Sequence, residues 1–116
     1  MKHTYHALID AKSVDKHVCV DDRKILSVLI SAANLIKADI LATNRYRFGH
    51  DTPEGCAVVL MLDESHITAH TYAEQGKMSI DVFTCNGKDN CESAANAIIK
   101  GLSIVNYEIN IIERFS

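Results

Sequence analysis

The most constraining feature of the sequence is an unbroken apolar run, Cys-Ala-Val-Val-Leu-Met-Leu, at residues 56–62. The run is too short for a typical helix, and its valines favour an extended chain. A continuous apolar run of this length is typical of a strand that is buried on both of its faces. The run therefore predicts a buried strand, and with it a sheet.

Strand patterns occur at five further places in the chain, and helical patterns occur at two. Apolar residues at helical spacing predict a helix over residues 22–37, capped at its first residue or at the residue before it. A second helix would be capped by Asp89 or Asn90 and stopped by Gly101. The further strands are expected at residues 4–10, 40–48, 67–72, 78–83 and 103–112.

The order of these elements is strand, helix, four strands, helix, strand. Short connections between consecutive strands indicate a mainly antiparallel sheet, with both helices on one face. The expected fold is a two-layer α/β sandwich of the α+β class, and a length of 116 residues predicts one domain, residues 1–116. Apolar residues on both sides of several strands indicate that the second face is also covered, which favours a dimer.

Composition narrows the classes of partner. A net charge of -3 gives no basic stripe for nucleic acid or anionic lipid. No apolar run approaches the roughly 18 residues that span a bilayer, and the first residues lack the apolar core of a signal peptide, so a cytoplasmic location is expected. The four cysteines lack metal or disulfide spacing and are expected as free thiols: Cys19, Cys56, Cys85 and Cys91.

Chemically active residue types gather in residues 63–72 and again in residues 80–85. Strand alternation places His66, Thr68 and His70 on one face. His66 and His70 form at most half of a metal site, because on a strand their imidazoles are far apart and no third ligand is implied; no metal is expected. Ser65 next to His66 lacks the GxSxG elbow of a hydrolase. The residues by themselves leave three interpretations open: a metal site, a hydrolase site and a strand end whose polar side chains only face water.

The same stretch resembles the processing site of the S-adenosylmethionine decarboxylase proenzymes of bacteria and archaea. Their pattern is an apolar strand ending in Glu-Ser-His, then His-Thr and an acid, a glycine turn, and a strand ending in Asp-x-Phe-Thr-Cys. A weaker likeness covers almost the whole chain, including Tyr5-His6 and Arg47-Phe48. The matching residues are Glu64-Ser65-His66, His70-Thr71, Glu74, Gly76 and Asp81-Val82-Phe83-Thr84-Cys85.

The resemblance implies that the chain cuts itself between Glu64 and Ser65, into residues 1–64 (the β chain) and 65–116 (the α chain). Ser65 Oγ would attack the Glu64 carbonyl, and the resulting ester would leave a pyruvoyl group at residue 65. That self-made cofactor would form a Schiff base with the substrate amine and accept electrons as carbon dioxide leaves. The implied reaction is decarboxylation of S-adenosylmethionine, which supplies the aminopropyl donor for spermidine.

Four further roles follow from the resemblance. His70 matches the processing histidine and Cys85 matches the proton donor, a role that suits a thiol because thiols of ordinary pKa, about 8.5, stay protonated at neutral pH. Glu74 matches the acid that holds the ribose hydroxyls, and Phe48 the ring that stacks on adenine. The resemblance also implies a homodimer of processed protomers with active sites near the interface.

The match is incomplete at several positions. Ala57 stands where the family usually has a serine, eight residues before the cleavage serine. Tyr72-Ala73 replaces Trp-Pro, the loop at residues 49–55 is longer, and Thr4 replaces the glycine of an N-terminal Gly-x-His. Strand alternation also sets Ser65 and His70 on opposite faces, so a bend at Ser65 is expected to bring them together.

These departures leave two alternatives open. Because the recognition residues match less well than the processing residues, the substrate could instead be ornithine or arginine. An acidic side chain would then hold the distal cation, and Asp51, Glu54 and Asp63 are the candidates. Alternatively, Ala57 marks a relative that no longer processes itself and serves as a binding or regulatory partner.

Overall fold

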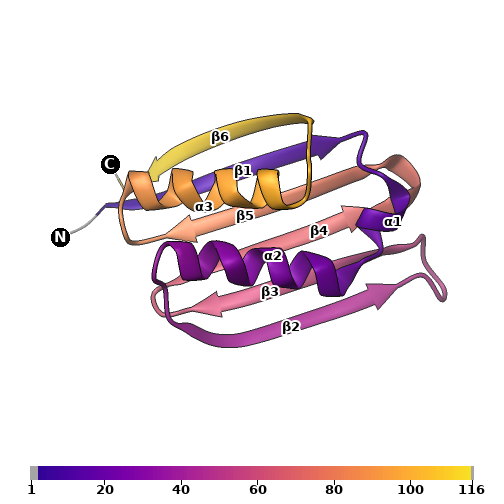
Figure 1. Ribbon diagram of the computed structural model, residues 1–116, viewed down its shortest axis with the longest axis horizontal. Coiled ribbons are helices and arrows are strands. Elements are labelled where there is room, and N and C mark those ends of the chain that lie inside the picture. Colours follow the sequence, from indigo (N-terminus) through magenta and orange to yellow (C-terminus); the bar gives the residue numbers. More distant parts are fainter. Residues whose placement is uncertain (1–2, 116) are drawn as a thin grey trace.

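The computed structural model describes residues 3–115. Figure 1 shows two layers: one sheet, and two long helices that cover one of its faces. Within these residues the sheet contains six strands, and the helical elements are three α-helices and one short 3-10 helix. The strands are β1 (Thr4–Lys12), β2 (Ile40–Phe48), β3 (Gly55–Leu62), β4 (Ser65–Tyr72), β5 (Lys77–Thr84) and β6 (Asn106–Arg114). The helical elements are α1 (Lys16–Cys19), α2 (Asp22–Leu35), η1 (Ala73–Gln75) and α3 (Lys88–Gly101).

The strands run antiparallel throughout, in the order β2-β3-β4-β5-β1-β6. The α+β class and the two-layer sandwich with both long helices on one face are therefore confirmed. Side chains of α2 and α3 pack on the sheet in one core, whose largest members are fully buried. Within residues 3–115, no helix has the length and apolar character needed to cross a membrane.

The helix limits follow from the caps. Asp21 caps α2 by accepting a hydrogen bond from the Lys24 amide at 3.1 Å, as one of the two predicted caps. The predicted caps of α3 are wrong, because Gly87 and neither Asp89 nor Asn90 precedes its first turn. The elements α1 and η1 were not predicted at all, since four and three residues are too few to show a helical period.

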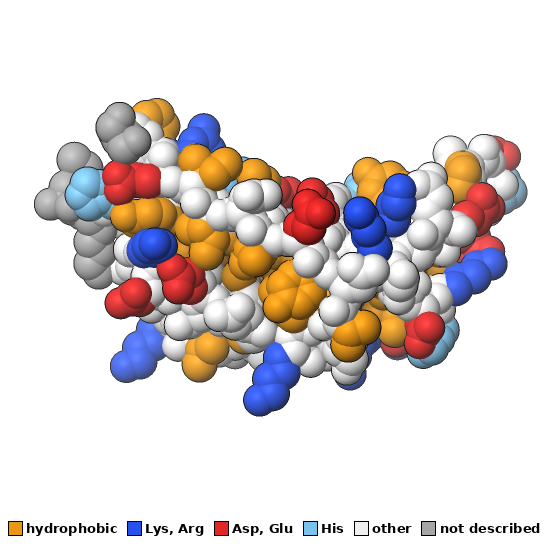
Figure 2. Space-filling model, turned by 90° about the horizontal axis from the view of Figure 1, so that it is seen from above, with side chains coloured by type: hydrophobic (Ala, Val, Ile, Leu, Met, Phe, Trp, Pro, Cys, Tyr) orange, Lys and Arg blue, Asp and Glu red, His pale blue; other side chains and the backbone are white. Residues whose placement is uncertain are grey.

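The apolar run at residues 56–62 is covered on one face only. Val58 and Leu60 point into the core and are fully buried, whereas Val59 and Met61 are 44% and 53% exposed on the helix-free face. Within the single chain, the run is therefore buried on one face and exposed on the other, so the coverage expected on the second face is not supplied by this chain. Figure 2 shows that this helix-free side, which we call the open face, is hollowed in outline.

Candidate active site

The Glu64–Ser65 peptide bond lies in the hairpin that joins β3 to β4. Leu62 pairs with Ser65, so Asp63 and Glu64 form a two-residue turn. Glu64 has a φ of 63°, a left-handed conformation that residues with a side chain seldom adopt. Backbone strain of this kind is concentrated at functional sites. The bond is thus presented at one end of the sheet, beside a strained and exposed residue.

Cys85, which directly follows β5, contacts both sides of this bond. Its thiol donates a hydrogen bond to the carbonyl oxygen of Glu64 at 3.0 Å. Its backbone N–H donates to Ser65 Oγ at 3.3 Å, and the Thr4 hydroxyl donates to its sulfur at 3.7 Å. Donors aimed at a carbonyl oxygen and at a hydroxyl stabilise the negative charge that develops when those two groups react.

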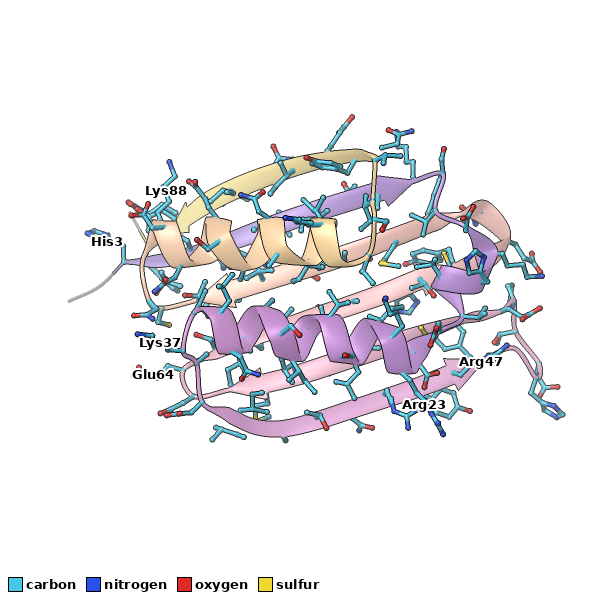
Figure 3. All side chains as sticks on the ribbon, viewed as in Figure 1. His3, Arg23, Lys37, Arg47, Glu64 and Lys88 are labelled. Atoms are coloured by element: carbon cyan, nitrogen blue, oxygen red, sulfur yellow. The ribbon has the colours of Figure 1, made fainter. Side chains whose placement is uncertain are left out.

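A mostly polar cavity of about 350 Å³ opens beside the Glu64–Ser65 bond. Its walls come from the connection between α2 and β2, from the hairpin and from the end of β5. Figure 3 shows Glu64 and Lys37 close together at this end of the sheet. Asp63, one of the acidic residues considered for a distal cation, lines the same cavity. We call this region the cleavage end.

A second cavity, of about 480 Å³, lies at the opposite end of the sheet. One wall is a row of rings, in which His70 lies 5.3 Å from Phe48 and 4.9 Å from Tyr72 between centroids. Glu74 of η1 also lines it, and its carboxylate makes no ion pair or hydrogen bond within residues 3–115. This region, which we call the aromatic end, combines flat apolar surface with one uncompensated negative charge.

Phe48 reaches across β3 because Gly55 has no side chain. A Cβ built on Gly55 would lie 2.7 Å from a ring carbon of Phe48 and 2.5 Å from the carbonyl oxygen of Thr71. Both distances are shorter than real Cβ contacts. The glycine is therefore required for the ring to lie against the backbone and contact His70.

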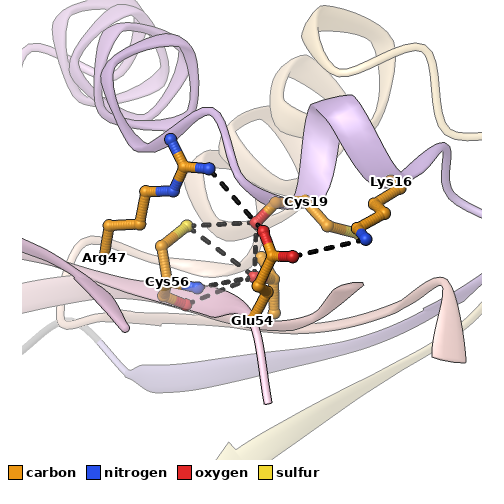
Figure 4. A network of polar contacts seen from close by, with 6 residues as sticks. Lys16, Cys19, Arg47, Glu54 and Cys56 are labelled. Carbon is orange, nitrogen blue, oxygen red and sulfur yellow. Dashed lines mark hydrogen bonds and ion pairs between the residues drawn. The ribbon is translucent and has the colours of Figure 1, made fainter. Parts of the chain in front are cut away.

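Beneath the aromatic end, a buried threonine ties three segments together. The Thr71 hydroxyl donates to the carbonyl oxygen of Cys19 at 2.6 Å and accepts from the backbone N–H of Cys56 at 2.8 Å, so β4 is joined to α1 and β3 (Figure 4). Burial raises the pKa of both the Cys19 and the Cys56 thiols, so these groups stay protonated and inert. The network fixes the strand segment that carries His70 and Tyr72.

Glu54 holds the loop that borders the same cavity. Its carboxylate forms ion pairs with Lys16 and Arg47 (Figure 4), at 3.3 Å from Lys16 Nζ and 3.7 Å from Arg47 Nη2. Its carbonyl oxygen accepts a hydrogen bond from the Ala73 amide at 3.1 Å. Two cations already neutralise Glu54, whereas Asp51 lies exposed and outside the cavity lining.

The structure does not bring Ser65 and His70 together within one chain. Both lie on β4, five residues apart, which corresponds to about 17 Å of extended strand. Ser65 is on the helix side and His70 is on the open face, and the expected bend at Ser65 is absent, so that expectation is wrong. Glu64, Ser65 and Cys85 lie at the cleavage end, and Phe48, His70 and Glu74 lie at the aromatic end.

Between the two ends, the open face carries a cluster around Phe83. His66 stacks on the Phe83 ring at 4.9 Å, His6 meets its edge at 5.7 Å, and Asp81 lies 3.3 Å from His6 Nε2. The pKa of His66 is lowered, first by burial and then by His6, while Asp81 opposes the shift. Among the described residues, no three His, Cys, Asp or Glu side chains gather as a metal site.

Several residues of both cavities were not predicted from the sequence. Lys37 and Asp39 reach the cleavage end from the connection before β2, and Thr52 and Pro53 reach the aromatic end from a loop. Strand and helix periodicity carries no information about where a connection folds back. For Thr52 and Pro53, the available signal was the length of the loop at residues 49–55.

Comparison with known proteins agrees with this geometry. A family model described as "S-adenosylmethionine decarboxylase" matches residues 5–115. The chain is 37% identical over 113 residues to the S-adenosylmethionine decarboxylase proenzyme of Sulfurihydrogenibium sp. (94% of this chain, 80% of that protein). It is 29% identical over 113 residues to the arginine decarboxylase proenzyme of Pyrobaculum arsenaticum (97% of this chain, 83% of that protein). The crystal structure of the adenosylmethionine decarboxylase from Aquifex aeolicus superposes with a TM-score of 0.85 at 26% identity, over 97% of this chain and 91% of that one.

The fold and the hairpin site together define a decarboxylase that is made as a proenzyme. The chain belongs to the S-adenosylmethionine decarboxylase family.

Proposed function

We propose that this chain cleaves itself between Glu64 and Ser65 and then decarboxylates S-adenosylmethionine with a pyruvoyl group derived from Ser65. The observation that carries the proposal is the pair of hydrogen bonds from Cys85 to Glu64 and Ser65. Membership of the decarboxylase family and the proenzyme names of its relatives support the same conclusion.

The cleavage step uses two groups that the hairpin already holds side by side. Ser65 Oγ attacks the carbonyl carbon of Glu64, a C–O bond forms, and the C–N bond breaks to give an ester and a free amine. Loss of the Ser65 α-hydrogen then breaks the bond from Cβ to Oγ and releases the Glu64 carboxylate. Tautomerisation and attack by water release ammonia and leave a ketone at residue 65. Residues 1–64 and 65–116 are the products.

The site fits a cofactor of this origin, because the precursor serine lies in a strained hairpin beside a polar cavity. The pyruvoyl group supplies an electron sink for the carbanion left by loss of carbon dioxide. The half-buried thiol of Cys85 donates to the Glu64 carbonyl next to residue 65, which supports its role as the group that returns a proton to the substrate carbon.

A second copy of the chain would complete the site. His70, Phe48 and Glu74 lie too far from Ser65 to act on it in the same chain. The open face that separates the two ends exposes apolar side chains, among them Val59, Met61 and Ile112. Two copies packed through this face in opposite directions would bring the aromatic end of one to the cleavage end of the other.

The aromatic end favours a nucleoside substrate. Rings of Phe48 and Tyr72 offer stacking surface for a flat base, and stacked rings contribute about 0.5–1.5 kcal/mol beyond burial. The uncompensated Glu74 carboxylate is an acceptor for two ribose hydroxyls. Both features suit S-adenosylmethionine, whose decarboxylated product is the aminopropyl donor in spermidine biosynthesis.

Arginine is the second candidate, and one observation favours it. The relative from Pyrobaculum arsenaticum named as an arginine decarboxylase proenzyme matches 97% of this chain. A guanidinium also stacks on aromatic rings and pairs with a carboxylate, so Phe48 and Glu74 would serve either substrate.

Intact mass spectrometry of the purified, denatured and reduced protein tests self-cleavage. The expected result is two species, residues 1–64 and residues 65–116, the second lighter than a serine start by one ammonia. A single full-length species after long incubation would favour the non-processing homologue instead. Release of carbon dioxide from S-adenosylmethionine, arginine and ornithine, each labelled at the carboxyl carbon, then identifies the substrate.

A further inference from the structure

His70 has two direct cross-strand neighbours on the open face. Ala57 of β3 pairs with it on one side, and Ser79 of β5 pairs with it on the other. Directly paired residues on one face have Cβ atoms about 4.5–5.5 Å apart. Because Ala57 carries no polar atom, Ser79 is the direct neighbour that is able to form a hydrogen bond with the imidazole.

The row continues with a carboxylate. Asp10 of β1 pairs with Ser79, and it faces the open side because its neighbours Ile9 and Ala11 are buried in the core. An imidazole, a hydroxyl and a carboxylate therefore follow one another across β4, β5 and β1. Ser79 also lines a cavity of about 380 Å³ together with Asp10, so its hydroxyl faces open space.

An imidazole that acts as a base needs a partner on its second nitrogen. That partner fixes which nitrogen carries the proton and holds the ring in one orientation. Within residues 3–115, neither the His70 nitrogens nor the Ser79 hydroxyl forms a hydrogen bond, with each other or with any other described group. Phe48 and Tyr72 contact the His70 ring by stacking, which limits its position without selecting a tautomer.

We propose that Ser79 is a positioning residue for His70. Its hydroxyl accepts the N–H of His70 and donates to Asp10, which leaves the other His70 nitrogen free to accept a proton during self-cleavage. His70 is exposed, so its side chain is able to turn toward β5, although this changes its ring contact with Phe48. The inference rests on the proposed function. It gives Ser79 the role of the hydroxyl that is missing at position 57, where this chain has Ala57.

Tyr46 carries another hydroxyl near this row, and it serves as a control. It pairs with Ala57 on the far side from His70, one strand further away, and it is 69% exposed. A Tyr46→Phe variant removes this hydroxyl and keeps the ring that contacts Phe48.

The test is the rate of self-cleavage in freshly expressed protein, followed by intact mass. Ser79→Ala is expected to cleave about tenfold or more slowly, whereas Ser79→Thr and Tyr46→Phe keep the native rate. Adding Ala57→Ser to Ser79→Ala is expected to restore most of the rate, because it returns a hydroxyl to the opposite side of His70. Unfolding midpoints of all variants show whether the fold is unchanged.

Three results would count against these assignments in different ways. Native cleavage in Ser79→Ala would overturn the role of Ser79 and leave the proposed function standing. Slow cleavage in both Ser79→Ala and Ser79→Thr, without rescue by Ala57→Ser, would show that Ser79 acts through packing and not through its hydroxyl. This result would also overturn the inference. Absence of cleavage in the native chain would overturn the proposed function itself.

Discussion

The Cys85 thiol lies 3.0 Å from the carbonyl oxygen of Glu64, and the amide nitrogen of the same residue lies 3.3 Å from Ser65 Oγ. One residue thus contacts both groups that must join for the chain to cleave itself. The turn that carries it is held in place, because the Asn86 amide donates to Thr84 Oγ1 at 2.8 Å. The approach of hydroxyl to carbonyl is therefore set by a short, hydrogen-bonded turn after β5.

Replacing Cys85 with alanine is expected to slow self-cleavage. The Cys85→Ala change removes the thiol donor from the Glu64 carbonyl and keeps the backbone N–H on Ser65 Oγ. Loss of one donor at such a position costs about 100-fold to 1,000-fold in strong cases, and a thiol is a weaker donor, so we expect about a tenfold reduction. Gel electrophoresis of timed samples measures the rate.

Cys91→Ala is the matched control for that experiment. Cys91 belongs to α3 and is fully buried, and burial raises its pKa to about 11, so it is an inert packing thiol. Its variant should cleave at the native rate despite a small loss of stability. Equal cleavage rates in Cys85→Ala and the native chain would show that the contact with Glu64 plays no part in processing.

Thr71→Val should destabilise the fold and loosen the aromatic end. Valine has nearly the same shape as threonine, but it takes away the hydroxyl that accepts from the Cys56 N–H and leaves the Cys19 carbonyl with only the Cys56 thiol as a donor. A buried group left without its partner costs about 1–3 kcal/mol, which urea unfolding detects. Thr43→Val on the exposed edge strand β2 is the control, with an expected change within about 0.5 kcal/mol. Equal midpoints for the two variants would contradict the role assigned to Thr71.

The fold was predictable because its signals are local. Period-two alternation, one continuous apolar run and period-3.6 patterns located the six strands and both long helices, and short connections then favoured an antiparallel order. Helix starts were less certain, since Gly87 caps α3 without a side-chain hydrogen bond. The sequence offered Asp89 and Asn90 as stronger caps, and neither is used.

The arrangement of the site was only partly predictable. The resemblance to the family motif singled out Glu64, Ser65 and Cys85, and the structure brings these three together. The distance from Ser65 to His70 was misjudged because a bend was expected where β4 is straight. Sequence patterns do not show how much of the second sheet face one chain leaves exposed; the structure does, with Met61 53% exposed.

Acid should destabilise the protein through His66. Its pKa is lowered in the folded state, so the unfolded chain binds more protons below its ordinary value of about 6.5. The stability linked to His66 is therefore complete above about pH 6.5 and decreases as the pH falls from there toward the lowered folded value. Urea unfolding at several pH values measures the slope, which should be smaller in His66→Gln. An unchanged slope in that variant would assign the effect to other groups.

Mixing two inactive chains should restore cleavage if two copies share each site. Ser65→Ala lacks the attacking hydroxyl, and His70→Ala lacks the imidazole at the aromatic end, so each variant expressed alone should remain largely uncut. Ser65 and His70 lie about 17 Å apart on β4 of each chain, so they cannot meet within one chain. In a mixed dimer packed through the open faces, the intact Ser65 of the His70→Ala chain would meet the intact His70 of its partner.

The expected result on co-expression is that the His70→Ala chain alone becomes cut, which intact mass separates from the uncut Ser65→Ala chain. Co-expression of His70→Ala with a chain that carries both substitutions is the control and should give no gain. If His70→Ala cuts no faster with Ser65→Ala than with the double variant, the two ends do not act between copies, and His70 must be removed from the processing site.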